Sequence, residues 1–295
     1  MAGVYREVTR LATTSQRRMP VRIAHTVNAT HEIAQGRRVE LAFGREGQEA
    51  RLPAVLLLPA SVTMPAPAAL LLHGFSSRKE QMAETVGVAL LAKGIASLSI
   101  DLPLHGARIE EGSETSWGLV GGYERAFDAR AMRSPLAIAG AWRTAQRDAK
   151  LALAYLGARG EVDRAGLAVV GYSMGSFLGV QTAADDPNVR ALVLAAGGDL
   201  PQAMPYARAL RLLSDPLRAV RRLNGRPLLM LHGRRDTTVR PDQAQRLFDA
   251  AAEPKELRWY EAGHYLPPHA LDDAASWLLA RLAPAARTAE NSQAG

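Results

Sequence analysis

The 295-residue sequence contains no cysteine, and this absence excludes several kinds of chemistry. Disulfide frameworks, thiolate-bound zinc or iron–sulfur sites and cysteine nucleophiles all need the missing side chain. Any covalent catalysis must therefore use another residue. Apolar residues make up 47% of the chain and charged residues 22%, which is typical of a globular protein that buries a sizeable core.

Long apolar runs are also missing. No uncharged stretch approaches the roughly 20 residues that are needed to span a bilayer. The first twenty residues carry four arginines with no apolar segment between them, which gives no support to a secretory signal. We therefore expect a soluble, cytoplasmic protein without a transmembrane segment.

Lysine is scarce, because only four of the 36 basic residues are lysines and the rest are arginines spread along the chain. Nucleic-acid-binding proteins gather basic residues into a stripe with a recognisable motif, so we expect no nucleic-acid partner despite the net charge of +7. The densest group, called here the arginine cluster, comprises Arg208, Arg211, Arg218, Arg221 and Arg222. We interpret it as a solvated helix face, with weak peripheral contact to an anionic membrane or an acidic ligand as the alternative.

Short apolar runs alternate with longer amphipathic segments, as in a mostly parallel sheet covered by helices on both faces. The sequence predicts eight strands, at Val39–Phe43, Ala54–Leu58, Ala68–Leu72, Ile95–Ile100, Leu167–Val170, Ala191–Ala195, Pro227–Leu231 and Leu257–Tyr260. It predicts five helices between and after them, at Gln81–Ala92, Ala137–Leu156, Ser176–Ala184, Pro241–Ala252 and Leu271–Leu282.

Two connections are much longer than the few residues common between elements of an α/β protein. We expect these connections, at about 106–135 and 199–226, to be lid-like insertions that border a ligand site. The predicted organisation is an N-terminal extension over 1–35, one domain over 36–283 that contains both insertions, and a disordered tail over 284–295.

The strongest chemical signal is Gly171-Tyr-Ser-Met-Gly175, which follows a predicted strand and precedes a predicted helix. In this context the pattern is typical of a nucleophile elbow, where the glycines allow close packing and the turn exposes the hydroxyl of Ser173. A serine hydroxyl is a weak nucleophile, so it needs a base, and the base needs an acid that orients it.

The base and the acid are sought after Ser173, in the chain order Ser, acid, His. His264 lies in a loop that follows the last predicted strand, and we predict that it is the base. His232 ends a strand and His269 begins a helix, so both are weaker candidates for the base.

Asp236 follows the strand before His264, and we predict that it is the acid. Two other carboxylates stay open as alternatives. Asp242 lies in the first turn of a predicted helix, where its interaction with the helix dipole already explains it, and Asp199 ends the strand after the elbow.

An oxyanion that forms during acyl transfer needs two hydrogen-bond donors. We expect them to be the backbone N–H groups of Met174, directly after the nucleophile, and of Phe75, in the loop after an early strand. His73 begins that loop, and we interpret it as a residue that shapes the loop more than as a second base. The residues predicted to contact substrate are His73, Trp117, Tyr172 and Tyr206.

Several motifs occur together in a recognisable order. They are His73-Gly74 followed by Lys79-Glu80, Asp101 with His105-Gly106, Asp148, Gly-Tyr-Ser173-Met-Gly, His-Gly-Arg-Arg-Asp236 and Ala-Gly-His264. Together they resemble the α/β-hydrolase superfamily, in particular its dienelactone-hydrolase-like and prolyl-oligopeptidase-like branch. The resemblance implies an eight-stranded fold and an acyl-enzyme mechanism. Dienelactone hydrolases have cysteine where this chain has Ser173, which argues against that activity.

The combined prediction is a serine carboxylesterase that acts on a small-molecule ester and needs no metal or organic cofactor. An acyl-CoA thioesterase is one alternative, since the arginine cluster could hold phosphates. A peptidase or amidase and a non-catalytic binding protein are the others. The sequence does not determine the oligomeric state, and a homo-oligomer is an open alternative.

Overall fold

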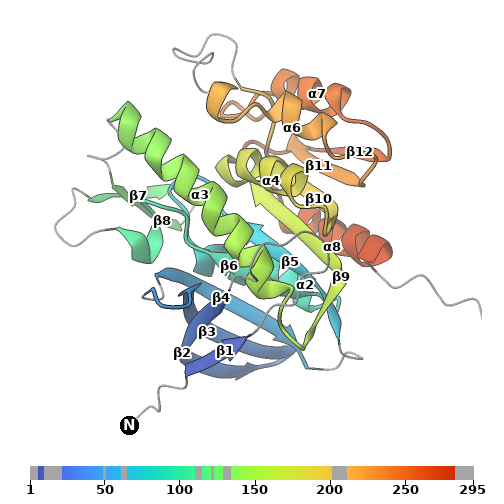
Figure 1. Cartoon of the computed structure of the whole chain (residues 1–295). Helices are drawn as coiled ribbons and strands as arrows, with labels where there is room; N and C mark the ends of the chain where they lie inside the picture. Colours follow the sequence, from blue (N-terminus) through green and yellow to red (C-terminus); the bar gives the residue numbers. More distant parts are fainter. Residues whose placement is uncertain are drawn as a thin grey trace, which may run out of the picture.

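The computed structural model describes residues 6–9, 22–48, 51–60, 65–109, 115–120, 123–128, 134–200 and 211–282. Ten strands lie side by side in one sheet (Figure 1). In spatial order they are β1 (Arg6–Thr9), β2 (Ile23–Ile33), β3 (Gly36–Arg45), β4 (Leu52–Pro59), β6 (Ala96–Ile100), β5 (Ala66–Leu72), β9 (Val162–Tyr172), β10 (Val189–Ala195), β11 (Leu228–Gly233) and β12 (Lys255–Tyr260).

The strands from β6 to β12 in this order are all parallel to one another. Apart from β12 at the edge, their sequences are mainly apolar because both faces of a parallel sheet are covered. In β9, for example, Val169 and Val170 are both buried, and they belong to cores on opposite faces. All eight predicted strands are present in this sheet, so the predicted fold class is confirmed.

The first four strands are antiparallel to one another, and β4 is antiparallel to β6. The sequence did not predict β2, whose residues His25, Asn28, Thr30 and His31 interrupt the apolar pattern. The start of β2, including His25, is buried, whereas Asn28, Thr30 and His31 further along the strand are exposed to solvent. The predicted domain start at residue 36 falls inside the hairpin that joins β2 to β3.

Helices cover both faces of the sheet (Figure 1). One face packs against α3 (Pro135–Leu156), α4 (Met174–Asp185), α6 (Pro216–Arg221) and α7 (Pro241–Ala250). The other face packs against α8 (Pro268–Leu282) and a helical segment made of α1 (Lys79–Met82), the π-helix η1 (Ala83–Gly87) and α2 (Val88–Leu91). All five predicted helices are therefore present, although the first is divided.

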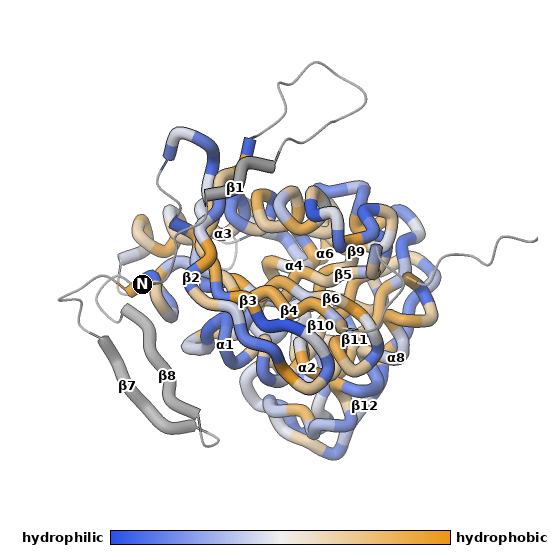
Figure 2. Tube along the Cα trace, turned by 90° about the horizontal axis from the view of Figure 1, so that it is seen from below, coloured by the Kyte–Doolittle hydropathy of each residue, from blue (hydrophilic) through white to orange (hydrophobic). Residues whose placement is uncertain are grey.

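Each long connection contains an element that the sequence did not predict. The first holds a short 3₁₀ helix, η2 (Gly106–Arg108), and an antiparallel pair, β7 (Thr115–Val120) with β8 (Tyr123–Asp128). The second holds α6, whose first turn is capped by the Asp215 carboxylate. In Figure 2 the hydrophobic positions gather along the central strands, and hydrophilic positions lie toward the outside. None of the helices in the described ranges is long and apolar enough to cross a bilayer.

Candidate active site

Ser173 occupies a sharp turn between the end of β9 and the start of α4. Its φ of 52° is rare for a residue with a side chain, which is the strained backbone expected at a nucleophile elbow. Gly175 must be glycine, since a Cβ atom there would lie 2.0 Å from the Leu72 carbonyl oxygen. The Ser173 N–H donates to the Ala195 carbonyl at 2.8 Å, which fixes the turn to the neighbouring strand β10.

His264 and Asp236 lie in line with this serine. The Ser173 Oγ is 2.8 Å from His264 Nε2, and His264 Nδ1 is 2.8 Å from the Asp236 Oδ2. With a neutral imidazole, Nδ1–H donates to the carboxylate, and Nε2 is left to accept the proton of the serine hydroxyl. The Asp236 side chain is fully buried while that of His264 is 15% exposed, so His264 lies at the solvent side of the pair. The structure thus brings together the three residues that the sequence predicted.

The Asp236 carboxylate is held from two sides. Its Oδ1 accepts hydrogen bonds from the backbone N–H groups of Thr238 at 2.8 Å and Val239 at 3.0 Å, while Oδ2 faces His264. Burial by itself would raise the pKa of Asp236, but the hydrogen bonds from His264 and these backbone groups outweigh it and lower the pKa. Asp236 therefore stays ionised at neutral pH and can stabilise a charged imidazole.

Two segments beside Ser173 carry the predicted oxyanion donors. Met174 is the first residue of α4, where backbone N–H groups lack partners from the helix itself. Gly74 packs against Ser173, because a Cβ atom built on it would lie 3.3 Å from the Ser173 Cβ. Phe75 follows Gly74 directly, so its backbone is also next to the elbow. That the two N–H groups bind an oxyanion remains a prediction.

A model of the alpha/beta hydrolase family matches residues 69–290. The chain belongs to this family. No curated protein matched it. Among solved structures, this hydrolase is similar to an acetyl xylan esterase from Paenibacillus sp. R4, with 18% identity over 89% of each chain and a TM-score of 0.66. A cold-adapted esterase from an Arctic intertidal metagenomic library is 19% identical, over 86% of this chain and 97% of that one, with a TM-score of 0.61. These likenesses confirm the fold.

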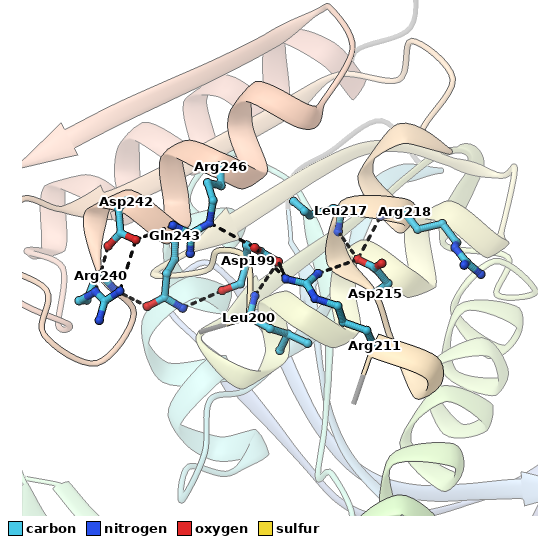
Figure 3. Close-up of polar contacts among 10 residues, drawn as sticks. All are labelled: Asp199, Leu200, Arg211, Asp215, Leu217, Arg218, Arg240, Asp242, Gln243 and Arg246. Atoms are coloured by element: carbon cyan, nitrogen blue, oxygen red, sulfur yellow. Dashed lines mark hydrogen bonds and ion pairs between the residues drawn. The ribbon is translucent and has the colours of Figure 1, made fainter. Parts of the chain in front are cut away.

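Asp199 and Asp242, the two other carboxylates considered for the acid, accept hydrogen bonds from arginine side chains (Figure 3). Asp199 is buried and accepts two hydrogen bonds from Arg211, at 2.8 and 2.9 Å, and one from Arg246 at 3.2 Å. Asp242 is exposed, and hydrogen bonds from Arg240 and Arg246 lower its pKa to about 2. Asp236 is thus the carboxylate that contacts His264, and the other two hold α7 and its surroundings together.

The loop that carries Asp236 is braced by Gln243, which the sequence did not single out. The Gln243 side chain is buried, accepts from the Arg240 N–H at 3.0 Å and donates to the Asp199 carbonyl at 2.7 Å (Figure 3). The N–H of Asp199 in turn donates to the Gln243 carbonyl at 2.9 Å. A glutamine in a first helical turn gives no sign of this role in the sequence, because its partner lies 44 residues away.

Two members of the arginine cluster are ion-paired within the hydrolase. Arg211 pairs with Asp199 and Asp215, and Arg222 pairs with Asp185. Arg208 lies outside the described residues. These pairs leave Arg211 and Arg222 with less capacity to bind the phosphates of an acyl-CoA.

The structure corrects the predicted substrate contact of His73. This side chain is fully buried, its Nδ1–H donates to the Gly74 carbonyl at 2.7 Å, and its Nε2 accepts the Leu102 N–H at 2.9 Å. Both ring nitrogens are therefore used within the protein, and neither is left for a substrate. The other interpretation of His73, as a residue that shapes the loop before Phe75, agrees with this geometry.

Asp101 and His105 support the same loop from the end of β6. The buried Asp101 carboxylate accepts from the backbone N–H of Lys79 at 2.8 Å, from its Nζ at 3.0 Å and from the Ala107 N–H at 2.9 Å. Gly106 packs on this carboxylate with a φ of 55°, so a side chain there would collide with it. The His105 ring lies edge-on to Phe75, with ring centroids 5.4 Å apart.

Three further predicted residues have different outcomes. His232 is buried behind the acid, where its Nε2–H donates to the Val239 carbonyl at 2.8 Å, so it is not positioned to be the base. Trp117 lies on β7, whose side chains are not described, and Tyr206 lies outside the described residues.

Within the described ranges, no group of three or more histidines or carboxylates is arranged to hold a metal ion.

Buried histidines make the stability of this hydrolase depend on pH. Burial and the nearby His105 lower the pKa of His73 to about 3, and burial also lowers the pKa values of His105 and His232. Below about pH 6.5 these histidines bind protons in the unfolded chain but stay neutral in the folded protein. The free energy of unfolding should therefore fall as the pH falls. His73 alone contributes up to about 1.4 kcal/mol per pH unit, a slope that is approached about one unit below pH 6.5.

Urea unfolding at several pH values between 7 and 5 measures this slope, in a window where most carboxylates stay ionised. The His73→Gln variant should show a shallower slope than the wild type. The His31→Gln variant, which changes an exposed histidine, should keep the wild-type slope. A wild-type free energy of unfolding that is constant from pH 7 to pH 5 would contradict the prediction.

Proposed function

We propose that this chain is a serine carboxylesterase that works through an acyl-enzyme. The observation that carries the proposal is the alignment of Ser173, His264 and Asp236 through two contacts of 2.8 Å at a strained turn. In the first step the Ser173 Oγ attacks the ester carbonyl while His264 Nε2 takes the hydroxyl proton. Asp236 keeps the imidazole in the required tautomer and stabilises its charged form.

The remaining steps follow from the same residues. The N–H groups of Phe75 and Met174 hold the negative oxygen of the tetrahedral intermediate. His264 then gives its proton to the leaving alcohol as the C–O bond breaks. Water repeats the cycle on the acyl-enzyme, which releases the acid and restores Ser173. Every proton is carried by His264, so the proposed mechanism needs no metal or organic cofactor.

Aromatic side chains next to the triad favour a substrate with an apolar part. Phe75, beside the nucleophile, and Tyr265, directly after His264, are 40% and 43% exposed. Exposed aromatic rings at a reacting centre can bury the acyl or alcohol group of a bound ester. We therefore propose a small, partly apolar ester as the substrate, and a cytoplasmic location for the enzyme.

The purified wild-type protein should hydrolyse nitrophenyl esters, and a panel graded by acyl length would report the depth of the acyl pocket. A fluorophosphonate, which reacts with activated serines, should label the protein once, at Ser173, as read by peptide mass spectrometry. Acyl-CoA thioesters and peptide anilides serve as comparison substrates. If the protein is not labelled and does not hydrolyse any of these substrates, the fold serves as a non-catalytic binding protein and the proposal is wrong.

A further inference from the structure

Tyr172 is the last residue of β9 and directly precedes the proposed nucleophile, but its hydroxyl reaches the loop of the proposed base. The Tyr172 hydroxyl donates to the His264 carbonyl at 2.8 Å and accepts the Leu266 N–H at 3.0 Å. These partners are 92 and 94 residues away in the sequence. One side chain therefore connects the strand of the nucleophile to the backbone of the base.

The loop from Glu261 to Pro267, which joins β12 to α8, is held differently at its two ends. Its first part is fixed to the loop after β11, where the Arg235 N–H donates to the Ala262 carbonyl at 2.9 Å and the Arg235 side chain donates to the Glu261 carbonyl at 2.8 Å. Among the described residues, Tyr172 is the hydrogen-bond partner of the backbone at both His264 and Leu266. In the second part of the loop, Leu266 also packs against the core beside α8, and the Tyr172 hydroxyl joins the backbone on both sides of Tyr265 to β9.

A fixed backbone at His264 matters because its ring must satisfy two partners at once. Asp236 and Ser173 contact opposite nitrogens of the imidazole, each at 2.8 Å. A shift of the backbone moves both nitrogens, and a displacement of about 1 Å can cost on the order of 100-fold in rate. The Asp236 contact restrains only the far end of the side chain.

The surroundings of the Tyr172 hydroxyl keep it in its protonated form. The side chain packs against the core formed with α8, and burial raises the pKa of Tyr172 to about 12. The hydroxyl thus keeps its proton through the pH range of an assay and can donate to the His264 carbonyl. Since its only proton is used there, Tyr172 has no hydrogen-bond donor left for a substrate.

We propose that Tyr172 is a positioning residue, which holds the backbone of His264 and Leu266 so that the imidazole lies between Asp236 and Ser173. This role replaces the substrate contact predicted for Tyr172 from the sequence. It rests on the proposed function, because it assigns to the hydroxyl an effect on the reaction that Ser173 and His264 carry out.

The test is Tyr172→Phe, which keeps the ring and removes the hydroxyl. We expect kcat for a nitrophenyl ester to fall roughly 10- to 100-fold while KM changes less than about twofold. Hydrogen exchange of the Leu266 amide, measured by NMR, should become at least about tenfold faster, because the amide loses its acceptor. The control is Tyr155→Phe on α3, which removes a part-buried hydroxyl that accepts a hydrogen bond from Arg159. It should leave kcat and the exchange of Leu266 unchanged.

Each other outcome rejects a specific statement. Faster exchange of Leu266 with an unchanged kcat would mean that the hydroxyl holds the loop without affecting the reaction, and the positioning role would be wrong. A raised KM with an unchanged kcat would restore the substrate contact instead. If the wild-type protein shows no turnover that requires Ser173, the proposed function is wrong. If wild-type turnover requires Ser173 but Tyr172→Phe has normal kinetics, only this inference is wrong.

Discussion

Replacing Ser173 with alanine should lower kcat for a nitrophenyl ester by at least about 10⁴-fold. The alanine side chain has no atom to form the acyl-enzyme, so only direct attack by water remains. The residual rate would come from the oxyanion donors and from substrate binding, which Ser173→Ala leaves intact. Initial rates of wild type and variant at saturating ester, together with fluorophosphonate labelling, measure the effect.

The matched control for this experiment is Ser134→Ala. Ser134 caps the first turn of α3, where its side chain accepts the Ala137 N–H at 3.3 Å. Its loss should reduce the free energy of unfolding by about 1 kcal/mol and leave kcat unchanged. Equal activity of wild type and Ser173→Ala would show that the ester is cleaved elsewhere, and the proposed mechanism would then be wrong.

Replacing Asp236 with asparagine should lower kcat by about 10⁴-fold. The reason is the tautomer of His264: an asparagine can donate its N–H to Nδ1, which leaves the proton of the neutral imidazole on Nε2. A protonated Nε2 faces the Ser173 hydroxyl, which is 2.8 Å away, and cannot accept its proton. The geometry of the site should be nearly unchanged, so the loss should occur in kcat with little change in KM.

Asp242→Asn is the control for the acid, because Asp242 is exposed and pairs with Arg240 and Arg246 at the start of α7. Its kcat should stay within about twofold of the wild type, because an exposed ion pair adds only about 0 to 1 kcal/mol to stability and its loss should not disturb the fold. A large loss in Asp242→Asn together with an intact rate in Asp236→Asn would transfer the role of the acid to Asp242.

Several strands that the sequence predicted, such as β4, β5 and β11, are buried on both faces, and nearly all of their residues are apolar. The strands that it did not predict are in antiparallel pairs. Polar residues such as Asn28 and His31 lie on β2 because an outer antiparallel strand has one face toward solvent. The pair β7 and β8 was missed for a similar reason, since sequences such as Thr115–Val120 show no sustained apolar run.

The candidate site was predictable to different degrees. The elbow was predictable because strand, glycines, serine and helix are adjacent in sequence, so the local pattern contains the whole turn. Asp236 was predicted as the acid from its place after the strand before His264, but Asp199 and Asp242 stayed open as alternatives, since all three follow or begin regular elements. The contact between His264 and Asp236 separates them, and it joins residues 28 apart.

By itself, the sequence determined the parallel core, predicted Ser173 as the nucleophile and excluded a cysteine in its place, because each of these depends on residue type and on neighbours along the chain. Tertiary structure decided what His73 and Tyr172 do. Both are polar residues beside the elbow and were expected to contact substrate, yet His73 bonds to backbone on two sides and Tyr172 to the loop of His264. Hydrogen bonds have direction and short range, so their partners become known only when distant segments are packed together.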